Sequence, residues 1–190
     1  MIKLTKGEKA VIGAKKFTVG LGWDANQSNT SSNLDLDVSV FMLNSNKVIP
    51  TEENFIYYNQ LKSNCLSVIH SGDCRNGETS STGDDETISI DLTKIPDNIV
   101  EMIFVVTIYE AEQRKQNFGM VRNSYIRIYD EFNIDLVKYE LDEDFSIETG
   151  VEFGRLYKRN GNWKFEASGI GYQADLAFFL EKYYDGTIIK

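Results

Sequence analysis

The chain has 190 residues, of which 42% are hydrophobic and 26% are charged, and its formal net charge at pH 7 is −9. This length favours a single domain spanning residues 1–190, and the apolar fraction is sufficient for a substantial core. Because binding to a phosphate backbone requires a basic surface, the negative charge argues against nucleic acid as a partner.

The N-terminal segment has the opposite charge, with five lysines against one glutamate in the first 20 residues. No apolar segment of signal-peptide length follows these lysines, and no later stretch approaches the ~20 apolar residues of a membrane span. Two cysteines, Cys65 and Cys74, do not make a disulfide framework. We therefore expect a soluble cytoplasmic protein with reduced thiols.

The first half of the chain has the hydrophobic patterns of β-strands. Alternating apolar residues predict strands at 17–23 and 34–43, and a turn at 44–46 leads into a short strand at 47–49. The apolar run 65–70 and the alternation at 88–92 predict two more strands. Residues 102–108 are apolar at nearly every position, which is typical of a central strand buried on both faces.

The second half continues this pattern. Strands are predicted at 124–129 and 137–141, and Asn160-Gly161 predicts a tight hairpin between strands at 153–159 and 163–167. Leu176, Phe179 and Tyr183 have helical spacing, and Asp175 is placed to cap that helix. Many short strands at near-regular spacing indicate an antiparallel sandwich or barrel with a short C-terminal helix.

Two acidic clusters stand out against this background. Asp35 and Asp37 alternate with the apolar residues of one predicted strand, so they share a face with Cα atoms roughly 6.5–7 Å apart. The second cluster lies in the glycine-bearing loop 72–86, which ends in Asp84-Asp85-Glu86. Paired carboxylates repel unless a cation lies between them, and oxygen ligands on such loops suit Ca²⁺. The sequence therefore predicts a calcium site, although acidic triplets also occur as solvated loop tips.

Cys65, His70 and Cys74 raise the alternative of a zinc site. Their C-x4-H-x3-C spacing matches no common structural zinc motif. His70 is also the only histidine, so any catalytic triad would depend on it.

Several segments together resemble the TerD family of tellurium-resistance proteins, and the resemblance runs through essentially the whole chain in order. The matching segments are Val19–Asp24, Leu34–Phe41, Phe55–Lys62, His70–Asp73, Gly83–Glu86, Phe104–Ile108, Gln116–Asn123, Tyr125–Ile128, Asn160–Phe165 and Gly169–Tyr172.

This resemblance implies a mainly β fold, an antiparallel β-sandwich with a short C-terminal helix. It also implies a cytoplasmic stress-response protein that binds one or two Ca²⁺ ions in acidic loops at one end of the sandwich and has no catalytic activity. Protein partners in a stress-response complex are expected. The implied ligands are Asp24, Asp35, Asp37, Asp73, Glu78, Asp84, Asp85 and Glu86, with the carbonyl of Gly77. Thr79–Thr82 departs from the shorter, more acidic loop of the family.

Two other functions remain open from the sequence. Bound calcium would let the loops bridge to anionic lipid headgroups, which gives a calcium-dependent membrane-binding module. Alternatively, the carboxylates would hold Mg²⁺ for phosphoryl transfer, but Arg75 is the only basic residue of the 72–86 loop that could clamp a phosphate.

Overall fold

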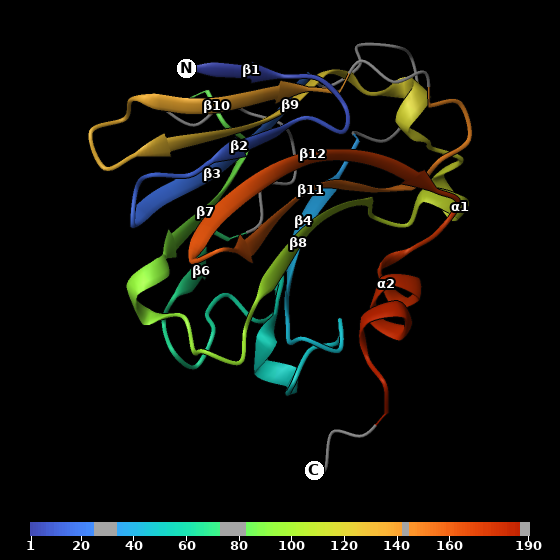
Figure 1. Ribbon diagram of the computed structural model, residues 1–190. Helices are drawn as coiled ribbons and strands as arrows, with labels where there is room; N and C mark the ends of the chain where they lie inside the picture. Colours follow the sequence, from blue (N-terminus) through green and yellow to red (C-terminus); the bar gives the residue numbers. More distant parts are fainter. Residues whose placement is uncertain (25–33, 73–82, 142–144, 187–190) are drawn as a thin grey trace.

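The computed structural model describes residues 1–24, 34–72, 83–141 and 145–186 (Figure 1). Their strands form two six-stranded sheets that pack face to face. The first sheet, in spatial order, contains β1 (Ile2–Leu4), β10 (Asp135–Glu140), β9 (Arg122–Asp130), β3 (Lys16–Asp24), β7 (Glu86–Asp91) and β6 (Val68–His70). The second contains β2 (Lys9–Val11), β12 (Asn162–Tyr172), β11 (Gly150–Arg159), β8 (Glu101–Ile108), β4 (Leu36–Leu43) and β5 (Phe55–Ile56). The predicted β-sandwich is confirmed.

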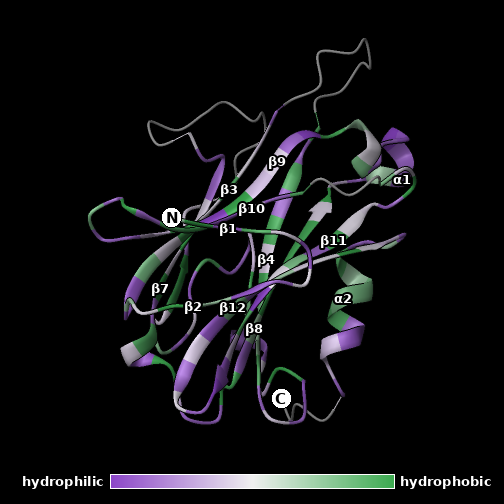
Figure 2. Ribbon diagram, turned by 45° about the horizontal axis from the view of Figure 1, so that its top comes forward, coloured by the Kyte–Doolittle hydropathy of each residue, from purple (hydrophilic) through white to green (hydrophobic). Residues whose placement is uncertain are grey.

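The main core lies between the two sheets, where alternate residues of each strand meet. Val19 and Leu21 of β3 and Ile126 of β9 face Val38 of β4 and Phe104 of β8 in one cluster. All eight residues of β8 are buried, as the continuous apolar run predicts. In Figure 2 the central strands accordingly carry long stretches of hydrophobic colour.

A second apolar cluster explains why β8 and β4 are buried on both faces. The helix α2 (Leu176–Tyr183) lies over the outer face of the second sheet (Figure 1). There Phe179 and Tyr183 pack with Phe41 of β4 and Val105 of β8. As predicted, Asp175 caps this helix, because its carboxylate accepts a hydrogen bond of 3.1 Å from the backbone N–H of Phe178.

Turn chemistry also follows the sequence. Asn160 and Gly161 adopt positive φ angles of 52° and 78°, which closes the predicted hairpin between β11 and β12. A short helix, α1 (Ala111–Arg114), follows β8. In the described part of the chain, short 3-10 helices occupy Glu52–Asn54, Leu92–Lys94 and Phe118–Met120.

Two local predictions were wrong. Residues 47–49 follow the turn but form no strand, because Lys47 has a positive φ of 66°. Leu66 also has a positive φ, 54°, so the strand predicted at 65–70 is shortened to β6 (Val68–His70). The short N-terminal strands β1 and β2 were not predicted from the sequence, and β1 pairs with β10 in parallel. Among the described residues, no helix is long and apolar enough to span a membrane.

Candidate metal site

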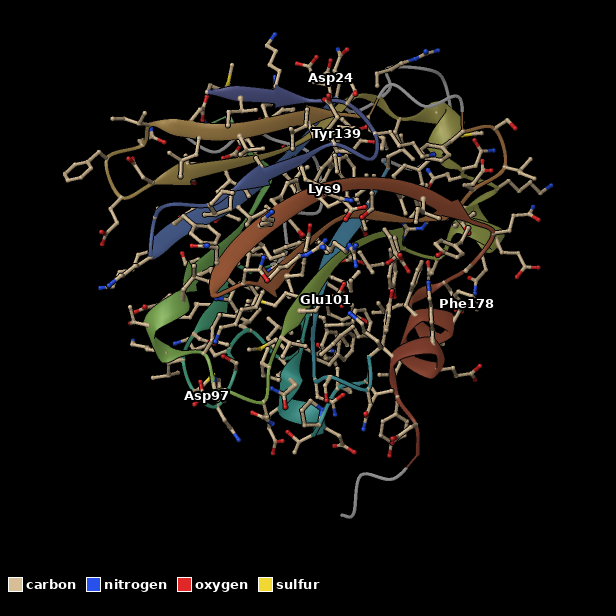
Figure 3. The ribbon with its side chains drawn as sticks, viewed as in Figure 1. Lys9, Asp24, Asp97, Glu101, Tyr139 and Phe178 are labelled. Atoms are coloured by element: carbon tan, nitrogen blue, oxygen red, sulfur yellow. The ribbon has the colours of Figure 1, made fainter. Side chains whose placement is uncertain are left out.

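Six of the predicted ligands, including Asp84 just before Asp85, lie at one end of the sandwich. Asp24 ends β3, Asp35 and Asp37 lie at the start of β4, and Asp85 and Glu86 lie at the start of β7. Leu21 pairs with Glu86 in the first sheet, and Asp37 pairs with Thr107, near the end of β8, in the second. A hydrogen bond from the backbone N–H of Val38 to Glu86 joins the two sheets at this end. Figure 3 labels Asp24 at this end and Asp97 at the opposite one. Asp73, Gly77 and Glu78 lie outside the described residues, as does Cys74.

Glu86 links the two sheets from inside the sandwich. Its Oε2 accepts a 2.8 Å hydrogen bond from the backbone N–H of Val38 in β4. The Nε2 of His70 lies 3.2 Å from the carbonyl oxygen of Val38 and 3.6 Å from Glu86. The backbone N–H of Gly72 donates to Nδ1 of His70 at 2.9 Å, so Nδ1 accepts and Nε2 carries the proton.

This arrangement has a structural cause in the sheet. The strand β5 pairs with β4 only at Val40 and Phe41, which leaves the backbone of Val38 beyond its reach. Buried backbone groups need partners, and the two side chains from the opposite sheet supply them. Both ring nitrogens of His70 are therefore engaged, which leaves none for the zinc ion considered above.

The carboxylate of Asp85 offers an oxygen atom for binding a cation. Its Oδ2 accepts a 2.8 Å hydrogen bond from the backbone N–H of Trp23, whereas its Oδ1 is buried and has no hydrogen-bond partner among the described residues. Burial raises the pKa of this carboxyl, and the charges of Asp84 and Asp24 raise it further, against the lowering effect of the Trp23 bond. A bound cation would satisfy the buried oxygen and offset these charges.

Asp84 is held differently, on the outer face of the first sheet. Both of its oxygens accept 2.8 Å hydrogen bonds from the Arg127 guanidinium, and the Tyr125 hydroxyl donates to Oδ1 at 2.9 Å. The side chain lies flat over Gly20 of β3, where a Cβ atom would come within 2.3 Å of a carboxylate oxygen. Hydrogen bonding to Asp84 raises the pKa of Arg127 even though burial opposes the shift. Asp84 thus anchors the chain where it enters β7.

Asp24, Asp35 and Asp37 are the remaining predicted ligands at this end of the sandwich. Asp37 is only 6% exposed, and Oδ2 of Asp35 lies 3.7 Å from Nη1 of Arg114 in α1. The carbonyl of Asp35 accepts a 2.8 Å bond from Tyr109, which fixes the start of β4 against the end of β8. Asp24 accepts a hydrogen bond from the amide of Asn123 at the start of β9.

Within the described ranges, no three His, Cys, Asp or Glu side chains are grouped closely enough to hold a metal ion. A complete site at this end therefore needs ligands from beyond these ranges. The residues predicted as loop ligands, Asp73, Gly77 and Glu78, lie beyond these ranges, and the structure does not test them.

Comparison with known proteins identifies the family. The model of the TerD domain matches residues 1–183 of the chain. The chain belongs to the TerD family. General stress protein 16U of Bacillus subtilis is 45% identical over 188 residues, and the tellurium resistance protein TerD of Serratia marcescens is 43% identical over 188 residues; each match covers 96% of both chains. These names state no enzymatic activity.

The fold is also that of solved TerD-like structures. The crystal structure of a homologue of telluride resistance protein TerD from Streptomyces coelicolor superimposes with a TM-score of 0.68 at 18% identity, covering 88% of this chain and 96% of that one. At this identity the likeness concerns the fold alone.

Sequence reasoning missed two features of this TerD-family site. His70 was considered as a zinc ligand and as the histidine of a catalytic triad, whereas in the structure it holds the backbone of Val38. Arg127, the partner of Asp84, was not considered. A signal for the place of Asp84 was present: Gly20 and Gly22 alternate with large apolar residues in β3, and an added Cβ would meet Asp84 at Gly20 and Tyr125 of β9 at Gly22.

Proposed function

We propose that this TerD-family chain binds Ca²⁺ at the acidic end of the sandwich and acts, without catalysis of its own, in a cytoplasmic stress response. Asp24, Asp35, Asp37, Asp85 and Glu86 would contribute oxygens from the strand ends, and Asp73, Gly77 and Glu78 from the loop. The ion would neutralise these carboxylates and join the loop to both sheets. Stress response and tellurium resistance enter through the names of the relatives.

The observation that carries the proposal is the buried, unpartnered Oδ1 of Asp85 beside the charges of Asp24 and Asp84. A buried carboxylate oxygen without a partner costs free energy, so it needs a compensating ligand. Carboxylates and backbone carbonyls are the oxygen donors that Ca²⁺ prefers, and 6–8 of them are needed. In this proposal Asp84 acts as a positioning residue, because Arg127 already binds both of its oxygens.

The proposal is tested by calorimetric titration of the full chain with Ca²⁺ and Mg²⁺, together with Asp85→Asn. We expect Asp85→Asn to weaken calcium binding strongly and, in chelator, to leave the protein as stable as the wild type or more stable. The amide keeps an oxygen for the N–H of Trp23 and removes a charge that burial disfavours. Saturating calcium should stabilise the wild type by about 2.7 kcal/mol at a hundredfold excess over Kd.

The matched control is Glu53→Gln, which removes a charge from the 3-10 helix Glu52–Asn54 before β5, away from the acidic strand ends. Its calcium affinity should equal that of the wild type. Absence of binding at millimolar Ca²⁺, or equal affinities for the Asp85 and Glu53 variants, would refute the proposed site.

A further inference from the structure

The short helix α1 places a positive charge against one of the proposed calcium ligands. Nη1 of Arg114 lies 3.7 Å from Oδ2 of Asp35, and the Arg114 side chain is 24% exposed. Arginine keeps its charge throughout the physiological pH range. In the metal-free protein this guanidinium therefore offsets part of the negative charge at the start of β4, where Asp37 is also buried.

The same guanidinium is held by a second carboxylate, which is not a proposed calcium ligand. Nε and Nη2 of Arg114 donate to Oε2 of Glu110 at 3.3 and 3.2 Å. The Cζ atom of Arg114 also lies 5.0 Å from the centre of the Tyr109 ring, within the range of a cation–π contact. Arg114 is thus shared between Asp35 on one side and two residues of its own segment on the other.

The backbone around α1 fixes this arrangement. Glu110 and Lys115, at the two ends of α1, have positive φ angles of 52° and 54°, which are uncommon for residues other than glycine. Such a conformation persists only where surrounding contacts hold it. The N–H of Tyr109 donates to the carbonyl of Asp35 at 2.8 Å, and the N–H of Arg114 donates to the carbonyl of Glu110 at 2.9 Å. These bonds keep the guanidinium between the two carboxylates.

A cation bound at Asp35 would repel the guanidinium of Arg114, because like charges about 4 Å apart interact strongly near a protein surface. Binding of a cation there therefore requires Arg114 to give up its contact with Asp35. Glu110 and Tyr109 are already in place to keep the guanidinium. That this end takes up a cation rests on a different residue, Asp85, whose buried Oδ1 has no hydrogen-bond partner among the described residues.

We propose that Arg114 sets the affinity of the acidic end for calcium. It occupies Asp35 in the metal-free protein and is held by Glu110 alone once the ion is bound. This inference rests on the proposed function, since it takes Asp35 to be a calcium ligand. Arg114 is then a competitor of the ion within the same chain, and Glu110 is the acceptor that lets it withdraw.

Calorimetric titration of the full chain with Ca²⁺ tests the competition. Arg114→Gln should bind calcium about tenfold more tightly than the wild type, because the like charge beside Asp35 is gone. Arg114→Lys keeps that charge and should stay close to the wild type. The matched control is Lys115→Gln, which removes a positive charge from the next, exposed residue. Its affinity should change by about twofold or less, since solvent and salt screen an exposed charge.

Glu110→Gln tests the exchange of partners. On its own this variant should weaken calcium binding by about threefold, because Arg114 is then left with Asp35. When it is combined with Arg114→Gln, it should have no effect beyond that of Glu112→Gln, which removes an exposed carboxylate of the same helix. Such non-additivity is expected for residues of one ion-pair network.

A further measurement needs no calcium. In chelator, Arg114→Gln should lower the thermal unfolding midpoint by about 1–2 °C, because Asp35 loses an ion pair that is partly buried. Lys115→Gln should leave the midpoint unchanged.

The outcomes separate the role of Arg114 from the function on which it rests. A wild type that binds no calcium would overturn both. If the wild type binds calcium, equal affinities of Arg114→Gln and Lys115→Gln would overturn only the role of Arg114, and so would an unchanged midpoint of Arg114→Gln in chelator. A loss of affinity in Glu110→Gln that persists in the double variant would mean that Glu110 itself binds the ion, and the proposed exchange would be wrong.

Discussion

At the scale of single residues, the feature that determines the interior of the acidic end is the backbone of Val38. Glu86 and His70 bind its N–H and C=O groups from the opposite sheet, where the neighbouring strand β5 has already ended. The sequence predicts that both residues lie on or beside strands. It cannot predict this contact, because the contact depends on how the two sheets pack.

His70→Ala should therefore destabilise the protein by about 2–4 kcal/mol, since it leaves the carbonyl of Val38 without a partner and opens a cavity. Urea unfolding in the presence of chelator measures this loss, with an unchanged m value expected. The exposed Asp97→Asn at the opposite end should change stability by no more than about 0.5 kcal/mol. Equal stabilities of the two variants would contradict the role assigned to His70.

At the scale of elements, α2 shows which features of a helix the hydrophobic periodicity of the sequence can predict and which it cannot. Helical spacing and the Asp175 cap predict its existence, and the structure confirms both. Its docking position is set by partners distant in sequence. The hydroxyl of Tyr183 donates to the buried Glu152 of β11 at 2.6 Å, and Lys182 binds the same carboxylate. Burial and this bond raise the pKa of Tyr183, which therefore remains a donor.

Two adjacent phenylalanines provide a matched test of this docking. Phe179 is fully buried against the second sheet, whereas Phe178 is 42% exposed. Phe179→Ala should cost about 3–5 kcal/mol of unfolding free energy, and Phe178→Ala about 1 kcal/mol or less. Chemical denaturation of both variants decides the matter, and similar losses would mean that α2 does not pack as described.

At the scale of the whole molecule, ion pairs on an outer face connect strands that are far apart in sequence. The face of the second sheet carries a chain of charges in which Arg155 binds Glu101 and Glu166, and Lys47 and Lys9 extend it. Figure 3 labels Lys9 and Glu101 at two points of this chain. Strand positions were largely predictable, because the alternation of apolar and polar residues depends only on neighbouring positions in the sequence. Sheet order and these cross-strand charge partners were not, because they arise from strands far apart in sequence.

The same contrast between local and long-range structure leads to a prediction for calcium. The strand β8 is central to the second sheet and buried on both faces, so its amides should exchange slowly with or without the ion. The segment 73–82 lies between His70 and the anchored Asp84 and carries the proposed loop ligands. Because calcium would neutralise the carboxylates of this segment, we expect the ion to change its exchange rates first. We therefore expect calcium to slow hydrogen exchange strongly in 73–82 and hardly at all in β8.

Hydrogen exchange followed by mass spectrometry measures both regions in one sample, and Mg²⁺ at the same concentration is the ion control. In Asp85→Asn the protection of 73–82 should be lost while β8 stays unchanged, because the variant removes a proposed calcium ligand and not a core contact. An equal rise in protection across 73–82 and β8 would mean that calcium folds the domain as a whole. The preformed sandwich end, with Glu86 and Asp84 already bound to their partners, would then not describe the metal-free protein.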